Sequence, residues 1–290
     1  MTVDVDAGSL AAERKASPVR EAIYRHAFLV RLTHWLNALA IVFMLGTGLS
    51  IFNAHPHLYW GVRGDEYDRP VVSIQAYNTV HGVRGLTQVG PITVDTTGVL
   101  GWSMTQGQWA SRAWPSWITI PSFQDLADAR RWHFFVAWTL VANGIVYGLW
   151  ALFSGHAWRD LRPTRADLKS IPRSIIDHIK LKHPAGEAAK RYNVLQKLAY
   201  LSVIFLLLPP AILMGFAMSP WLDSIIPGWV DFFGGRQSAR TIHFIVAWLM
   251  VAFVLVHVFE VIVSGLWNHL RSMITGRYRI GEEAGDEKAR

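Results

Sequence analysis

Four long apolar segments dominate the hydrophobic pattern of the chain. They run over residues 35–52, 132–153, 198–218 and 241–263, each close to the roughly 20 residues that a helix needs to cross a bilayer. Because a buried helix of a soluble protein is seldom apolar on every side for this length, the pattern predicts an all-α integral membrane protein with four transmembrane helices. Residues 1–24 are polar and mixed in charge, and we expect them to form a flexible N-terminal tail.

Two of the connections between these segments are unusual. Residues 53–131 form a long loop, and stretches such as VGPITVDTTGVLGW predict turns, short strands and surface aromatic residues in it. In the connection over residues 154–194, Thr164 can cap a helix that has Asp167 in its first turn. Apolar and basic residues alternate along this helix. We therefore expect it to be amphipathic and to lie on the membrane surface, with Pro172 kinking or dividing it.

Basic residues are distributed unequally between the two sides of the predicted bundle. Nineteen Lys and Arg lie in the N-terminal segment, the 154–194 connection and the C-terminal segment, whereas eight lie in the two connections on the other side. The positive-inside rule then predicts that both termini are cytoplasmic, that residues 53–131 form an outer loop, and that residues 277–290 form a cytoplasmic C-terminal tail. Membrane topology explains the net charge of +7, so nucleic acid is not expected as a partner.

The chain contains no cysteine but has 12 histidines. The absence of cysteine excludes disulfides, Cys-ligated zinc, ordinary iron–sulfur clusters and covalently attached c-type haem. If the protein binds a redox metal, histidine is therefore the expected ligand.

Four histidines lie inside or at the edges of the predicted helices, where an ionisable side chain is costly and a functional role is the default expectation. His34 lies near the inner side and His133 near the outer side. The last helix contains both His243 and His257, which are about 21 Å apart along the axis and face nearly the same direction. Depth therefore pairs His243 with His133 on the outer side. On the inner side it pairs His257 with His34.

This arrangement favours two b-type haems, each held by two histidines in the core of the bundle. Small residues on the same helix faces, among them Ala38, Gly48, Gly144 and Gly148, would let a flat macrocycle approach the backbone. Small residues also serve ordinary helix packing in membranes. A proton relay, a transporter, or histidines that only hydrogen-bond between helices remain alternatives.

Other polar residues near these positions have less specific interpretations. Arg31 near the inner pair, and Gln237 and Arg240 near the outer pair, could bind haem propionates, because Arg matches carboxylates in a bidentate geometry. Solvated rim charge explains them equally well. The outer-loop sequence His55-Pro56-His57 resembles a metal-binding fragment, but no cysteine or matched carboxylate motif accompanies it, so a metal is not the favoured reading there.

The pattern resembles the bacterial cytochrome b561 group, which includes the cytochrome b subunits of nickel–iron hydrogenases, formate dehydrogenases and thiosulfate reductases. The resemblance covers residues 25–276 and is carried by Arg31-Leu32-Thr33-His34-Trp35, Trp132-His133, His243 and His257. The stretches PTRADLKSIPRSIIDHIKLKHP, YNVLQKLAYL, GGRQSARTIHFIVAW and NHLRSMITGRY look most like the thiosulfate-reductase-type branch. The long first loop departs from the smallest members of the group.

The resemblance implies a four-helix cytochrome b domain over residues 25–276 with two non-covalent b haems. Carried over to this chain, His34 and His257 bind the inner haem. His133 and His243 bind the outer one. It also implies a protein of the bacterial inner membrane, in contact with lipid, that passes electrons between the quinone pool and a periplasmic redox subunit. In the thiosulfate-reductase-type branch that partner is a molybdopterin oxidoreductase.

Two other functions stay open. A single-chain quinone-linked oxidoreductase could act on superoxide or ferric iron at the outer haem, and it would need an open outer pocket rather than a docking surface. A proton-coupled transporter would have inverted repeats and broken helices. The only candidate break is Pro209-Pro210 in the third apolar segment, which has no counterpart. We therefore expect an electron-transfer subunit rather than a stand-alone enzyme.

Overall fold

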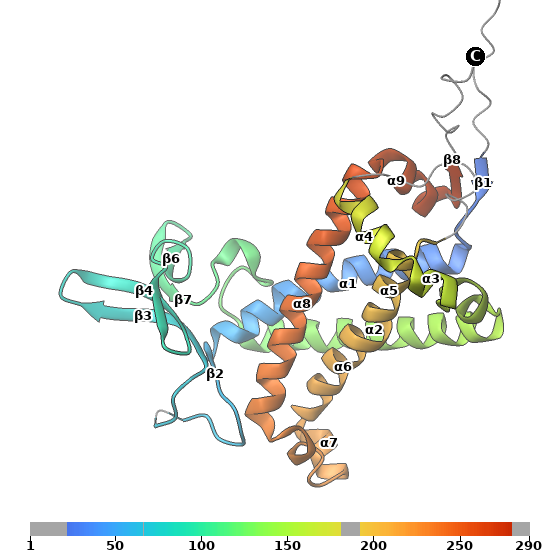
Figure 1. Cartoon of the computed structure of the whole chain (residues 1–290). Helices are drawn as coiled ribbons and strands as arrows, with labels where there is room; N and C mark the ends of the chain where they lie inside the picture. The colour runs from blue at the N-terminus through green and yellow to red at the C-terminus, as the bar shows by residue number, and fades with distance from the viewer. Residues whose placement is uncertain (1–21, 66, 181–191, 280–290) are drawn as a thin grey trace, which may run out of the picture.

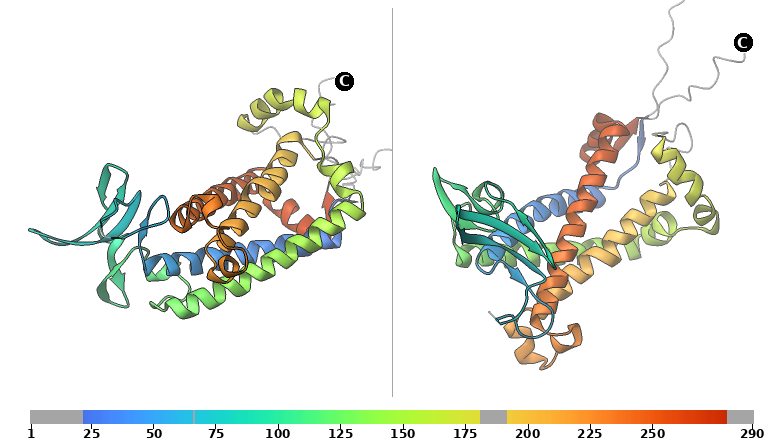
Figure 2. Two further views of the ribbon diagram at one scale, coloured as in Figure 1. Left: turned by 90° about the horizontal axis from the view of Figure 1, so that it is seen from below. Right: turned by 60° about the vertical axis from the view of Figure 1, so that its left-hand side comes forward.

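The computed structural model describes residues 22–65, 67–180 and 192–279. Within these ranges, four helical segments are long and apolar enough to cross a membrane: α1 (Phe28–Asn53), α2 (Leu126–Phe153), the segment Val194–Ala217 and α8 (Arg236–Val263). α1 lies along α2 and α6 lies along α8, and the two pairs cross each other, with the strands at one end and α3, α4 and α9 at the other (Figures 1 and 2). These two ends are called outer and inner after the predicted topology. The predicted four-helix membrane bundle is confirmed by these elements.

The third span is not one regular helix. It consists of α5 (Val194–Leu201), a π-helical turn η4 (Ser202–Leu207) and α6 (Leu208–Ala217). Pro209 and Pro210 lie in the first turn of α6, and their missing N–H groups leave carbonyls of the preceding turn without their usual helical donors. The break that the sequence allowed at this proline pair is therefore present.

The outer loop folds into β-strands, so the all-α prediction is wrong for this part of the chain. An antiparallel sheet contains β2 (His57–Leu58), β3 (Val72–Thr79), β4 (Gly82–Val89) and β5 (Ile92–Asp95) in that order. A separate hairpin contains β6 (Gly101–Thr105) and β7 (Gln108–Arg112), and a short 3-10 turn η1 (Ser116–Ile118) follows. The turn residues Gln106 and Gly107 both have positive φ, as a tight two-residue hairpin requires. The expectation of short strands in this loop is confirmed.

The strand layer is attached to the outer ends of α1 and α8. Phe52 at the end of α1 packs against Leu58, Ile74 and Ala113 of the loop, with Phe244 of α8 beside them. Backbone and hydroxyl groups complete the attachment, because Thr241 Oγ1 donates to the carbonyl of Tyr59 at 2.6 Å and the N–H of Gly61 donates to Ser238 Oγ at 2.7 Å. The long loop is thus a folded layer over the outer face of the bundle.

Short elements cover the inner end of the bundle. A π turn η2 (Ala157–Leu161) follows α2 and leads to α3 (Arg165–Lys169) and α4 (Ile171–Ile179). Thr164 and Asp167 form the expected cap of α3, and Pro172 divides the predicted amphipathic helix, since it lies in the first turn of α4. Ile175, Ile176 and Ile179 on α4 are exposed, as a helix on a membrane surface requires.

The two predicted tails meet at the inner side. β1 (Ala22–Tyr24) pairs antiparallel with β8 (Arg277–Arg279), directly after α9 (Leu266–Thr275). The remaining residues of both tails lie outside the described residues. Between the third span and α8, the outer turn contains α7 (Pro220–Ile225) and the 3-10 turn η5 (Asp231–Phe233).

Candidate haem-binding sites

The structure brings the four span histidines together in two pairs. The ring centres of His34 and His257 are 6.2 Å apart, and those of His133 and His243 are also 6.2 Å apart. The first pair joins α1 to the inner half of α8, and the second joins α2 to the outer half of α8. These are the partners that helix geometry and depth predicted.

The ring spacing fits one metal ion between each pair. A histidine nitrogen lies about 2.0 Å from a bound metal, so two rings on opposite sides of one metal have centres about 6.3 Å apart. Both observed spacings are within a tenth of an ångström of this value. Two imidazoles are a common ligand set for b haem, and the pairs His34–His257 and His133–His243 would each supply one such set.

Hydrogen bonds hold both rings of the outer pair. Nδ1 of His133 lies 2.9 Å from Thr47 Oγ1 on α1, and Nδ1 of His243 lies 2.9 Å from the carbonyl oxygen of Ala211 on α6. The Ala211 carbonyl can only accept, so Nδ1 of His243 carries the proton and Nε2 keeps its lone pair. A metal ligand of this kind almost always donates its other N–H to such an acceptor.

Glycines lie beside both rings of the outer pair. A Cβ atom at Gly48 of α1 would lie 3.5 Å from Cε1 of His133, and one at Gly215 of α6 would lie 3.8 Å from Cε1 of His243. A larger side chain at either position would meet the imidazole. Gly144 and Gly148 on α2, which the sequence also marked as small, have open space where a Cβ would be. Gly48 and Gly215 therefore admit the two imidazoles of the outer pair, whereas the space beside Gly144 and Gly148 is open.

Each ring of the inner pair contacts an aromatic side chain. The ring of His34 meets Trp35 edge-on at 5.4 Å between centres, and the ring of His257 stacks on Phe253 at 5.9 Å. Within the described part of the chain, Nδ1 of His34 is buried without a hydrogen-bond partner. These two rings are positioned by packing.

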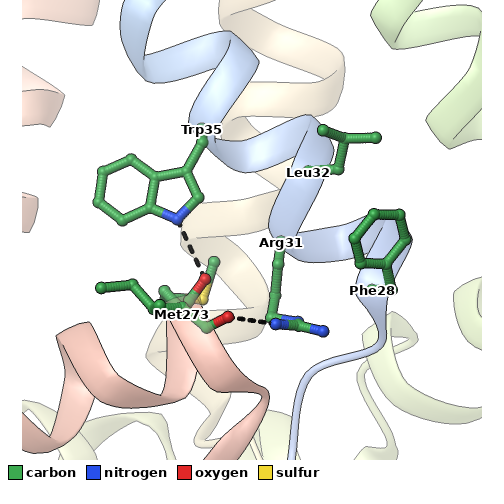
Figure 3. Close-up of a pocket in the computed structure, with 6 residues that line it drawn as sticks. Phe28, Arg31, Leu32, Trp35 and Met273 are labelled. Atoms are coloured by element: carbon green, nitrogen blue, oxygen red, sulfur yellow. Dashed lines mark hydrogen bonds between the residues drawn. The ribbon is translucent and has the colours of Figure 1, made fainter.

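Arg31 lies at a small apolar pocket on the inner side (Figure 3). The pocket has a volume of about 240 Å³ and is lined by Phe28, Arg31, Leu32, Trp35, Met273 and Ile274. Arg31 donates to the carbonyl of Ile274, and the indole N–H of Trp35 donates to the carbonyl of Met273 at 3.0 Å. The structure thus places Arg31 three residues before His34 and against the end of α9. Its role toward a propionate stays a prediction.

The two polar residues predicted near the outer pair lie one and two turns before His243. Arg240 donates to the carbonyl of His55 and lies over the ring of Phe52, with 5.8 Å from Cζ to the ring centre. The side-chain oxygen of Gln237 is buried without a hydrogen-bond partner among the described residues. Both therefore lie where α8 meets the strand layer, and neither has a carboxylate of this chain as its recorded partner.

Two histidines of the outer loop, His55 and His57, form a small cluster with Tyr59 near Arg240. The rings of His55 and His57 are 5.3 Å apart, and Tyr59 lies 6.0 Å and 6.2 Å from them. Burial, followed by the positive charge of Arg240, lowers the pKa of His55. The positive charge of Arg240 also disfavours a metal cation between His55 and His57. Among the described residues, no three or more His, Cys, Asp or Glu side chains lie together as a metal site would need.

The sequence did not predict the residues that contact the outer histidine pair. Thr47 is an ordinary helix residue in the sequence, and the Ala211 carbonyl carries no sequence signal except that it follows Pro209-Pro210. Gly215 was likewise not singled out. Each of these contacts depends on which faces of neighbouring helices meet, which periodicity within one helix does not determine.

Comparison of the sequence with known proteins identifies its family. The model of the prokaryotic cytochrome b561 family matches residues 25–276. The chain belongs to the prokaryotic cytochrome b561 family. The chain is also 26% identical over 233 residues to a candidate protein-methionine-sulfoxide reductase subunit, YedZ1, of Azospira oryzae, covering 80% of this chain and 87% of that protein. This membership makes the chain a membrane electron-transfer protein and implies b-type haem.

Proposed function

We propose that this cytochrome b561 family member is a dihaem electron-transfer subunit of the bacterial inner membrane. Electrons would pass between the quinone pool and a periplasmic redox partner. The single observation that supports this best is the presence of two histidine pairs, each with ring centres 6.2 Å apart, at two depths of one bundle. The separation of about 21 Å along α8 spans much of the roughly 30 Å apolar core of a bilayer.

The chain's own residues bind, orient and bury the two haems in this proposal. Each haem, when bound, supplies one-electron transfer at its iron. His34 and His257 are the proposed inner ligands, and His133 and His243 the outer ones. Helices α1, α2 and α8 keep the two pairs at a fixed separation and exclude water from the space between them. Arg31, Gln237 and Arg240 are proposed to bind propionates.

The partner is proposed to dock on the strand layer. This layer is folded, is attached to α1 and α8, and has large exposed side chains such as Trp60, Tyr67 and Trp109. The name of the relative from Azospira oryzae describes a subunit of a protein-methionine-sulfoxide reductase. A periplasmic oxidoreductase, of molybdopterin type, is the partner class we propose. Both termini of this chain would then lie in the cytoplasm, as the distribution of Lys and Arg predicts.

Quinone is proposed to react on the inner side, close to His34 and His257. His257 is exposed in the structure, so a lipid-soluble ring could approach this pair from the bilayer. The outer pair is more enclosed, since the strand layer and α6 lie beside it. In one direction quinol would be oxidised near the inner pair and the partner reduced at the outer side. In the other direction the partner would supply the electrons and quinone would be reduced near the inner pair.

Spectroscopy on the purified chain tests the haem content. The full-length protein in detergent should have a reduced b-type α-band and two haems per chain by pyridine haemochrome assay. His133→Ala should retain one haem, and His257→Ala should retain the other. A colourless protein, or the loss of both haems from His133→Ala with the fold intact, would contradict the proposal.

A sided assay tests the electron path. In liposomes containing the oriented protein, a lipid-soluble quinol should reduce a membrane-impermeant acceptor on the side of the strand layer. His34→Ala and His133→Ala should each abolish this transfer. In native membranes, a periplasmic oxidoreductase should co-purify with the detergent-solubilised chain and be lost when the 72–112 strands are replaced by a short linker.

A further inference from the structure

The segment Gly46-Thr47-Gly48 of α1 contacts the ring of His133 through Thr47 and Gly48, and the function proposed above makes no use of it. The Thr47 side chain is fully buried, with 0% of its surface exposed. A Cβ at Gly46 would lie 2.7 Å from Cγ1 of Ile120, so this glycine admits the outer loop against the helix. Gly48 admits the imidazole of His133 on its own side. Thr47 thus lies between the contact of Gly46 with Ile120 and the contact of Gly48 with His133.

The direction of the hydrogen bonds shows which nitrogen of His133 has the proton. Thr47 Oγ1 lies 2.6 Å from the carbonyl oxygen of Phe43, which can only accept, so the hydroxyl donates there. The same oxygen then accepts from Nδ1–H of His133 at 2.9 Å. Nε2 is left unprotonated, with the lone pair that a metal binds.

His243, the second outer histidine, also has a hydrogen-bond acceptor at Nδ1 and a glycine beside its ring, both supplied by α6. Nδ1 of His243 donates to the Ala211 carbonyl at 2.9 Å, and Gly215 lies beside its Cε1 atom. Both outer rings therefore have an acceptor on Nδ1 and a glycine along one edge. Among the described residues, neither ring of the inner pair has either feature.

We propose that Thr47 is a positioning residue that sets the redox potential of the outer haem through His133. The Ala211 carbonyl acts in the same way through His243. This inference rests on the proposed ligation of the outer haem by these two histidines. An acceptor on Nδ1–H raises the basicity of Nε2 and so favours the ferric iron that it binds. Thr47 therefore lowers the potential of the outer haem and fixes the rotation of its ligand.

Two substitutions separate the hydroxyl from the shape of the side chain. Thr47→Val keeps the branched shape and removes the acceptor, whereas Thr47→Ser keeps the acceptor. Redox titration of the full-length protein measures each haem, and a His257→Ala background isolates the outer one. At the wild-type midpoint, Thr47→Val should raise the ratio of reduced to oxidised outer haem about tenfold, a positive shift of about 59 mV for one electron.

In Thr47→Val the inner haem should keep its wild-type midpoint. In Thr47→Ser both haems should keep theirs. The low-spin ferric EPR signal of the outer haem should change in Thr47→Val alone. Loss of the outer haem from Thr47→Val with its retention in Thr47→Ser also supports the proposal. Equal behaviour of the two variants, an unchanged outer midpoint in Thr47→Val, or an equal shift of both haems would overturn it.

Thr33→Val is a matched control. Thr33 is also buried on α1, and its hydroxyl donates to the carbonyl of Leu29 at 2.8 Å, four residues before it, as that of Thr47 does to Phe43. Its hydroxyl has no recorded bond to an imidazole. This variant should leave the outer midpoint unchanged. If the proposed function is wrong, the wild-type protein contains no haem. If only the role of Thr47 is wrong, the wild type contains two haems and the outer midpoint is unchanged in Thr47→Val.

Discussion

The outer and inner histidine pairs have the same ring spacing but different surroundings. In the outer pair, His133 and His243 each have an oxygen acceptor 2.9 Å from Nδ1. In the inner pair, Trp35 and Phe253 contact the rings, and Nδ1 of His34 has no hydrogen-bond partner within the described residues. One pair is oriented by directional bonds and the other by packing.

This difference predicts two haems with different properties. Ligands that donate a hydrogen bond from Nδ1 are stronger donors, so the outer haem should have the lower potential. Ligands held only by packing can rotate when neighbouring side chains move, so the inner haem should respond more to changes at the inner end of the bundle. Local changes should therefore affect one haem at a time.

The largest expected effect comes from filling the space beside an outer ligand. In Gly48→Leu the side chain would extend beyond the Cβ position that already lies 3.5 Å from Cε1 of His133. The ring must move away, and we expect haem content to fall from two to one per chain, measured by pyridine haemochrome assay. Gly48→Ala makes only ordinary contact and should keep both haems. Two retained haems in Gly48→Leu would show that the ring is not confined as described.

Acidification should weaken the inner side more than the outer side. His26 lies just before α1, is 8% exposed, and stacks on Tyr192. Burial, followed by the charge of Arg25, lowers the pKa of His26 from 6.5 to about 4. Protonation therefore favours states in which His26 is exposed, so its stabilising contribution is complete above pH 6.5 and is lost between pH 6.5 and 4.

This loss should reach at most about 3 kcal/mol for local opening of the β1–β8 pairing. Hydrogen exchange of the β1 and β8 amides as a function of pH measures it. His26→Phe should remove the dependence on pH, and the amides of β3 and β4 serve as an outer-side reference. If hydrogen exchange of the β1 and β8 amides still depends on pH in His26→Phe, another titrating group causes the effect.

Breaking the attachment of the strand layer should weaken the outer side alone. Asn53 Oδ1 accepts from the N–H of Trp114 at 2.7 Å, and its Nδ2 donates to the carbonyl of the same residue at 3.2 Å. Asn53→Leu leaves both backbone groups unpaired, at a cost of about 2 kcal/mol. Heating should release the outer haem at a lower temperature and leave the inner one unchanged. The exposed Asn78→Leu is the control and should behave like wild type.

The smallest expected effect concerns the hydrogen bond between Trp35 of α1 and Met273 of α9. Trp35→Phe keeps the edge contact with His34 but removes the N–H that donates to the carbonyl of Met273 at 3.0 Å. The loss is about 1 kcal/mol, and the amides of α9 should exchange faster. The outer haem should keep its midpoint potential. A change at the outer haem instead would show that the two ends of the bundle are coupled.

Patterns within one helix were enough to predict the membrane core. The lengths of the apolar segments predicted the four spans. The helical rotation of 100° per residue placed His243 and His257 on one face of the last span, and their depth then predicted the partner of each. The cap and proline signals were also correct, since Thr164 caps α3 and the Pro209-Pro210 pair follows a π turn.

Features that depend on contacts between distant segments were not predicted. The pairing of β1 with β8 joins residues about 255 positions apart, and no local pattern records it. The outer loop was expected to contain strands, but its sheet order depends on cross-strand contacts. Thr47 acquires its importance only because α1 packs against α2 at His133. The two histidine pairs were therefore accessible from sequence, and the groups that hydrogen-bond to the outer pair were not.

Double variants test the pairing of the four histidines most directly. His34→Ala with His257→Ala removes both members of the inner pair, whereas His34→Ala with His133→Ala removes one member from each pair. With two independent bis-histidine sites, the first protein should retain one b haem per chain and the second should retain none. Equal haem content in these two folded proteins would contradict the account.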